Sequence, residues 1–165
     1  MTTEFIISTN RRVCVNKRGG DFSVTIEEPG SVLKRVTLPA KRWAALVAIE
    51  PQIEQSLALL QSQQYVKLNT HIGGGYFVSV TTGFRCVDIR RFYYNSTMQM
   101  TLPTKDGVAL NLGQWSLFKE IVQQINREFP NLAKTELCMH QNLTELLNCN
   151  ECHPFDDMMK PLSWQ

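Results

Sequence analysis

Cysteine and histidine side chains gather near the end of the chain, where their chemistry would suit a metal ion. Cys138, His140, Cys149 and Cys152 provide enough soft ligands for a tetrahedral zinc site, and the Cys-x-x-Cys pair has a usable spacing. The first pair falls within a short helix predicted over residues 135–147, where side chains two positions apart point in different directions. We therefore expect unliganded thiols and no cofactor, with zinc as the weaker alternative.

The residue patterns of common enzyme classes do not occur in this sequence. It contains no Gly-rich phosphate loop, no Ser-His-Asp arrangement and no pair of carboxylates predicted to converge. His71, His140 and His153 lie in unrelated contexts. The expectation is a protein that binds a partner and is not an enzyme.

The charges of the chain are segregated, although the net charge is only +2. Residues 1–129 contain 15 Lys and Arg against 10 Asp and Glu, whereas residues 130–165 contain 2 against 5. A mildly basic body allows a polyanionic partner without requiring one. Charge alone therefore leaves nucleic acid as one candidate among several.

The cysteine count and the apolar pattern predict a compartment. The five cysteines form an odd set without the spacing of a disulfide framework, which favours a reducing environment. The first residues do not resemble a signal peptide, and no apolar stretch approaches the roughly 20 residues that span a bilayer. We expect an intracellular protein with no membrane partner.

The sequence contains two similar halves. Residues 34–43 align without a gap with residues 106–115, which places Trp43 against Trp115. The same offset continues downstream, where apolar residues pair at intervals of three and four positions. In the second half these residues lie on one face of an amphipathic helix, predicted from about 113 to 128.

Alternating apolar residues upstream predict paired strands in both halves. Residues 12–15 align with 77–80 and residues 22–26 with 87–91, and turns containing glycine separate the strands. Between 92 and 107 the second half has seven extra residues, so its third strand should be longer.

Each half is therefore predicted to contain four strands followed by one helix, which is an α+β fold. The first helix contains Pro51, which should kink or split it after Glu50. We predict one unit over residues 1–62 and a second over 63–129, paired as an intramolecular pseudo-dimer. Residues 130–165 would form an acidic extension with a short helix.

Three stretches of the second half share their order and spacing with a known family. They are the strand THIGGGYFVSV at 70–80, the strand VDIRRFYY at 87–94 and the junction PTKDGVALNLGQWSLFKE at 103–120. The second half thus resembles the single-stranded DNA-binding module of the positive cofactor four family of transcriptional coactivators. The resemblance implies curved antiparallel sheets that pair to form a groove for single-stranded DNA. In the family the pair comes from two chains, whereas here one chain can supply both members. Pairing of whole chains into a homo-oligomer is the alternative.

The resemblance assigns nucleic-acid contacts to side chains of the second half. Phe84 and Tyr93 look like the aromatic residues on which bases stack. The residues that look like phosphate contacts are Arg85, Arg90 and Lys105, with Tyr76 and Arg91 beside them. The loop at 81–86 is shorter than in the family, and Asp106 replaces an expected cation, so we expect reduced affinity through this half.

The first half offers mainly positive charge. Its candidate phosphate contacts are Arg11, Arg12, Lys17, Arg18, Lys34 and Arg35. Phe22 is the one aromatic residue on its hairpin, so we interpret this half as the electrostatic one. Trp43 and Trp115 are assigned to the core because their neighbours in helical register are apolar.

These features predict a non-enzymatic, largely sequence-independent single-stranded DNA-binding protein that serves transcription or replication, in the nucleus or at another site of nucleic-acid synthesis. One alternative is an interaction or assembly module that kept the fold without the groove and binds a protein partner through its acidic extension. RNA is a further alternative, because stacking and phosphate contacts do not read the sugar.

Overall fold

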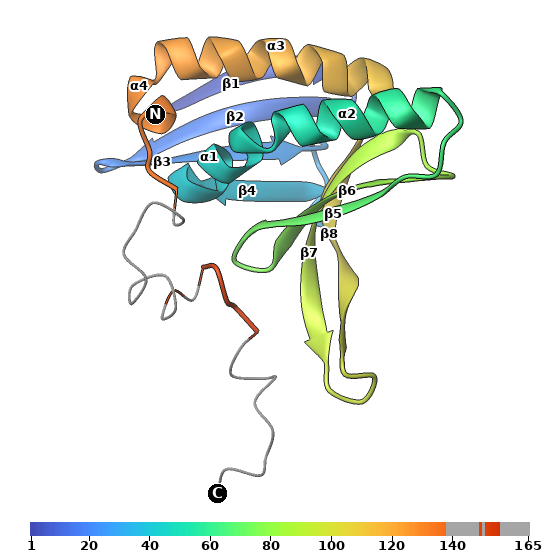
Figure 1. Ribbon diagram of the computed structural model, residues 1–165. Helices are drawn as coiled ribbons and strands as arrows, with labels where there is room; N and C mark the ends of the chain where they lie inside the picture. The colour runs from blue at the N-terminus through green and yellow to red at the C-terminus, as the bar shows by residue number, and fades with distance from the viewer. Residues whose placement is uncertain (138–148, 150, 156–165) are drawn as a thin grey trace, which may run out of the picture.

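The chain forms two four-stranded antiparallel sheets, each followed by helices (Figure 1). This computed structural model describes residues 1–137, 149 and 151–155. The first sheet contains β1 (Thr2–Ser8), β2 (Arg11–Arg18), β3 (Asp21–Glu27) and β4 (Arg35–Pro39). The second contains β5 (Lys67–Gly73), β6 (Tyr76–Thr81), β7 (Cys86–Asn95) and β8 (Met100–Asn111). The helices are α1 (Ala40–Ala48), α2 (Glu50–Gln61), α3 (Leu112–Glu128) and α4 (Pro130–Ala133). The predicted α+β fold is confirmed, and the element order is consistent with two tandem units.

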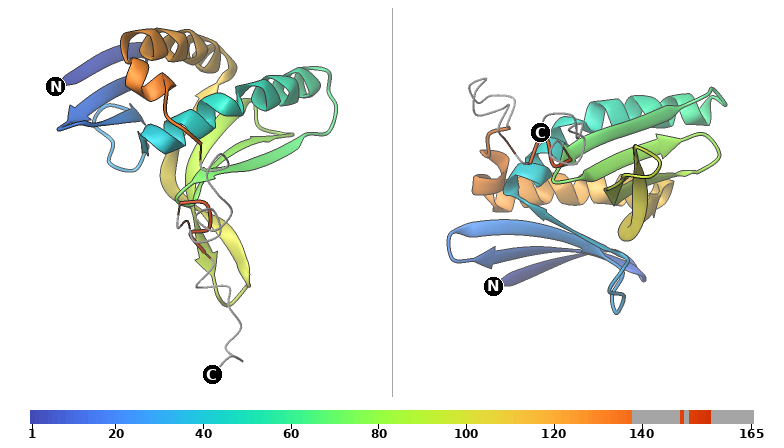
Figure 2. Two further views of the ribbon diagram at one scale, coloured as in Figure 1. Left: turned by 60° about the vertical axis from the view of Figure 1, so that its left-hand side comes forward. Right: turned by 90° about the horizontal axis from the view of Figure 1, so that it is seen from below.

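One hydrophobic core joins the two sheets. Alternate residues of the strands, such as Val13 and Val24 in the first sheet and Val78 and Ile89 in the second, are buried on the helix side. All belong to a single cluster with residues of α1, α2 and α3. The helices run side by side across both sheets (Figure 2). Neither sheet therefore has a core of its own.

The two tryptophans of the aligned segments are buried and bridge the halves. Trp43 on α1 donates a hydrogen bond from Nε1 to Asn126 Oδ1 on α3, at 3.1 Å. Trp115 on α3 donates from Nε1 to Glu54 Oε1 on α2, at 2.8 Å. The assignment of both rings to the core is confirmed.

The helices predicted to follow the strands of each half are observed, and their ends have local causes. The helix predicted from about 113 to 128 is α3, which begins with a capping box formed by Asn111 and Gln114. The helix predicted to break after Glu50 is indeed interrupted near Pro51, but the break falls at Ile49, because α1 ends at Ala48 and α2 begins at Glu50 with Pro51 in its first turn. None of the helices in the described part of the chain is long and apolar enough to cross a membrane.

The strand register corrects the alignment of residues 22–26 with 87–91. Val13 pairs with Ile26 in the first sheet, and Val78 pairs with Ile89 in the second. The β6–β7 turn is thus two residues shorter than the β2–β3 turn, and residue 24 corresponds to 87, not 89. The stretch from Ile89 to its partner Val108 covers 19 positions, against 10 from Ile26 to Val36. The second half therefore gains nine residues, not seven, and they lengthen both β7 and β8.

The extension differs from its prediction where it is described. A short helix, α4, follows α3 directly, because Pro130 can begin a helix. Residues 135–137 are not helical, although they fall within the helix predicted over 135–147, and the rest of that segment lies outside the described residues.

Candidate nucleic-acid interface

The β7–β8 hairpin carries an exposed aromatic ring and projects from the body of the molecule (Figure 1). Tyr93, near the far end of β7, is 44% exposed, and Phe84, in the turn before β7, is 66% exposed. At about 3.3 Å per residue, the rings are separated by roughly 25 to 30 Å. A single-stranded nucleic acid that contacted both rings would have to follow β7 over several nucleotides.

Arg90 does not lie beside Tyr93. Its guanidinium pairs with Asp88, with Nη2 3.1 Å from Oδ1, and Nη1 donates to the carbonyl oxygen of Thr104 at 2.9 Å. Arg90 and Phe92 share the face of the second sheet that is turned away from the helices, because the Phe92 ring contacts that of Phe77, at 4.7 Å between centroids. Tyr93, one position on, faces the other side. Arg90 and Tyr93 therefore lie on opposite faces of β7, and their assignment as nucleic-acid contacts stays a prediction.

Tyr76 and Arg91 face residues of the first half. They line a groove of about 350 Å³ between the two sheets, which we call the inter-sheet groove. Its lining residues are Val32, Arg35, Thr37, Tyr76, Arg91 and Asp106. Arg91 Nη2 lies 3.3 Å from Asp106 Oδ2. Asp106, which stands where the family resemblance predicts a cation, therefore neutralises Arg91. The structure thus brings Arg35 of the first half together with Tyr76 and Arg91 of the second.

Most cations of the first half are paired with carboxylates. Arg12 lies 2.8 Å from Glu27 and 3.2 Å from Glu4, and Arg35 lies 3.5 Å from Glu27. The hydrogen bond to Glu27 raises the pKa of the Arg12 guanidinium. These pairs reduce the positive charge that the first sheet offers to a phosphate.

A second carboxylate, Glu28, holds two further candidates. Arg11 Nη1 lies 3.1 Å from its Oε1, and Lys34 Nζ lies 3.2 Å from its Oε2. The hydrogen bond from Lys34, with that from Arg11, holds the pKa of Glu28 below its ordinary value. Arg11 and Lys34 are therefore largely neutralised.

Exposed cations remain on both halves. Lys17 and Arg18 are exposed and line a groove of about 510 Å³ on the first sheet, together with Arg35. Arg85 and Lys105 of the second half are exposed, and neither forms an ion pair within the described part of the chain. Phe22 is not available for stacking on both faces, because its ring packs edge-on against Phe129 at 5.8 Å and lies under Lys17.

The second sheet carries a row of aromatic rings that the sequence pattern was not used to predict. His71, Phe77 and Phe92 lie on the face turned away from the helices, and the His71 and Phe77 ring centroids are 5.0 Å apart. Burial lowers the pKa of His71, and its Nε2 accepts a hydrogen bond from the Gly75 N–H at 3.0 Å. Strand alternation in β6, where Val78 and Val80 are core residues, could have identified Phe77.

The thiols considered for zinc are only partly described. Cys138 and His140 lie outside the described residues. Cys149 and Cys152 are half-buried, and the His153 N–H donates to the Cys149 carbonyl oxygen at 3.0 Å.

Comparisons with known proteins bear on the second half. No solved structure matches the chain. A Caenorhabditis elegans protein described as "Putative RNA polymerase II transcriptional coactivator" is 31% identical over 52 residues, which is 32% of this chain and 42% of that protein. The chain thus aligns with less than half the length of this relative. Residues 77–121, from β6 into α3, match the family described as Transcriptional Coactivator p15 (PC4).

Proposed function

We propose that this protein is a non-enzymatic, largely sequence-independent single-stranded DNA-binding protein that acts in transcription in the nucleus. The observation that carries the proposal is the exposure of Phe84 and Tyr93 within the segment that matches the coactivator family. An aromatic ring that stacks on a base contributes about 1–3 kcal/mol, and every base has a face on which to stack. Large exposed rings on a strand and its turn suit such contacts.

The two halves pair as sister units in this proposal. Trp43 aligns with Trp115, and at the same offset Glu54 aligns with Asn126. The two tryptophan hydrogen bonds are therefore reciprocal, each half donating to the corresponding helix of the other. Reciprocal contacts are the signature of a two-fold interface. They support an intramolecular pseudo-dimer of tandem units.

The strand would cross from β7 to the first sheet by way of the inter-sheet groove. Tyr93 and Arg91 are two positions apart, so they lie on the same face of β7. Arg91 and Arg35 both line the groove. The exposed cations that would contact phosphates are Lys17, Arg18, Arg85 and Lys105. The other candidate cations would contribute less, because carboxylates already hold them; they are Arg11, Arg12, Lys34, Arg35, Arg90 and Arg91.

Fluorescence anisotropy with a labelled oligothymidine of about 20 nucleotides tests the proposal. Four engaged cations predict a slope near −3 when the logarithm of the association constant is plotted against that of salt concentration. Absence of binding at roughly 50 mM salt would refute the proposal. An oligouridine titrated alongside tests the RNA alternative.

A protein-interaction module is the second candidate. The carboxylates that neutralise cations of the first sheet favour it, as do Met98 and Met100, which are exposed near the tip of the β7–β8 hairpin. This candidate predicts no oligonucleotide binding and retention of a protein partner, which the same titration and an affinity capture distinguish.

A further inference from the structure

Arg42 on α1 holds a carboxylate from the distant C-terminal extension. Its Nε and Nη2 contact the two carboxylate oxygens of Glu151, with Nη2 3.1 Å from Oε2. The Gly74 N–H donates to the Glu151 carbonyl oxygen at 2.8 Å. Residue 151 is thus held by α1 through its side chain and by the β5–β6 turn through its backbone.

The β5–β6 turn is shaped around Arg42. Gly73, Gly74 and Gly75 all have positive φ, and a Cβ at Gly74 would collide with the Arg42 guanidinium. Only glycine allows the backbone to approach this closely. The guanidinium holds the Glu151 carboxylate and the Gly74 N–H holds the backbone carbonyl oxygen of the same residue, so two neighbouring donors are occupied by one residue of the extension.

The corresponding place in the second half carries no charge. Gln114 is the third residue of α3, as Arg42 is of α1, and it receives a hydrogen bond from the Asn111 N–H and donates to Ser8 Oγ at 3.1 Å. The first half has Pro39 before its helix, which has no N–H to donate. The side chain at this position is therefore not needed for a capping box, and a cation stands there.

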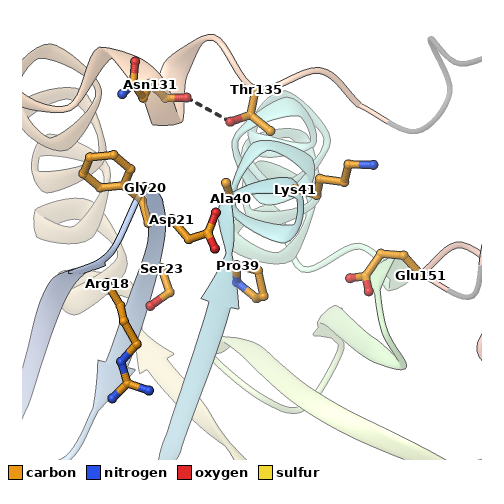
Figure 3. Close-up of a pocket in the computed structure, with 11 residues that line it drawn as sticks. Arg18, Gly20, Asp21, Ser23, Pro39, Ala40, Lys41, Asn131, Thr135 and Glu151 are labelled. Atoms are coloured by element: carbon orange, nitrogen blue, oxygen red, sulfur yellow. Dashed lines mark hydrogen bonds between the residues drawn. The ribbon is translucent and has the colours of Figure 1, made fainter.

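Arg42 lies next to the proposed path of the strand. Its guanidinium carbon is 5.0 Å from the centroid of the Tyr76 ring, and Tyr76 lines the inter-sheet groove. Glu151 also borders a pocket of about 620 Å³ with Arg18 and Lys41, between the β2–β3 turn and the start of α1 (Figure 3). Two cations, Arg18 and Lys41, and one carboxylate, Asp21, thus line the pocket that Glu151 borders.

We propose that Arg42 and the Gly74 N–H form a phosphate-binding position for the nucleic-acid strand, and that Glu151 occupies it in the free chain as an intramolecular competitor. This inference rests on the proposed function. A carboxylate and a phosphate both present two oxygens to a guanidinium fork. The apparent affinity for the strand is the intrinsic affinity reduced by the fraction of chains in which the position is open.

The test is Glu151→Ala in the full chain, with Glu136→Ala as the matched control. Glu136 is an exposed carboxylate of the same extension, so both variants lose one negative charge. A partly exposed ion pair has an energy that corresponds to about a two- to fivefold change in a binding constant. Glu151→Ala should therefore bind oligothymidine about two- to fivefold more tightly than Glu136→Ala. Equal affinities of the two variants would overturn the inference.

Two further measurements separate the inference from the function on which it rests. Arg42→Gln in the Glu151→Ala background should remove the gain, and the Gly74 amide signal of the unaltered chain should shift in an NMR titration with oligothymidine. If the chain binds the strand but the Gly74 signal stays in place, the phosphate position is wrong and the proposed function stands. If no variant binds the strand, both are wrong.

Discussion

Two exposed rings, Phe84 and Tyr93, are the residues on which the proposed function depends most. Neither contributes to the core, because Phe84 lies in a turn and Tyr93 on the projecting part of β7. Their removal should therefore affect binding and leave the fold intact.

We predict that the double variant Phe84→Ala with Tyr93→Ala lowers affinity for single-stranded DNA by on the order of 2 kcal/mol or more, if each ring stacks on one base. Anisotropy gives the affinity, and circular dichroism checks that the thermal transition is retained. Unchanged affinity would place the binding surface elsewhere.

At the residue scale, sequence could identify side-chain type but not side-chain partner. The resemblance pointed to both Arg90 and Tyr93, yet Arg90 is paired with Asp88 two positions earlier on the same face of β7. Arg90 and Tyr93 are three positions apart, and an odd separation along a strand places two side chains on opposite faces. The carboxylates that hold Arg12 and Arg35 come from β1 and β3, and strand pairing brings them close only in the folded chain.

At the element scale, the close contact between β7 and β8 depends on Gly107. A Cβ at this position would lie 2.7 Å from the Ile89 carbonyl oxygen and 2.9 Å from the Arg90 Cα, which are backbone atoms that cannot move aside. The Gly107 N–H also donates to the Leu33 carbonyl oxygen, at 3.2 Å, and so joins β8 to the first half.

Gly107→Ala should therefore lower the free energy of unfolding by about 1–3 kcal/mol, as overpacking typically does. Gly20→Ala is the control, since a Cβ added there would meet nothing within 4 Å and the φ of Gly20 is not positive. Urea denaturation of both variants measures the difference. Equal stabilities would contradict the close approach of the strands.

Periodicity predicted the long elements well but not their exact offset. The helical spacing around Trp115 and the break at Pro51 are local properties, and both appear in the structure. The alignment of the β3 sequence with the β7 sequence depends on the length of the turn before each strand. A shift of this alignment by two residues still matches inward-facing residues with inward-facing residues. Apolar alternation alone therefore could not decide whether Val24 corresponds to Val87 or to Ile89.

At the scale of the whole molecule, the halves are joined by a shared core and by reciprocal tryptophan contacts. Glu54 is part of this junction, because it accepts from Trp115 and lies 2.8 Å from Lys119 Nζ. Burial acts to raise the pKa of Glu54, but the hydrogen bonds from Lys119 and Trp115 outweigh it and hold the pKa below the ordinary 4.5.

A carboxyl group whose pKa is lower in the folded chain stabilises the fold above its unfolded pKa, and this contribution is lost as pH falls through the folded pKa. The free energy of unfolding should therefore decrease as pH is lowered from about 5 to 3, and Glu54→Gln should remove part of that decrease. For a partly exposed pair this part is below about 1 kcal/mol. Denaturation across pH measures it, with the exposed Glu120→Gln on α3 as control. Identical pH dependence in both variants would show that Glu54 does not take part.

The central claim is that one unpaired strand contacts both halves of the chain. Photocrosslinking with an oligothymidine that contains 4-thiothymidine, followed by mass spectrometry of the peptides, tests it most directly. The account predicts crosslinks to the peptide that contains Tyr93 and to peptides around Lys17 or Arg35. Crosslinks confined to one half, or to the outer surfaces of α2 and α3, would contradict it.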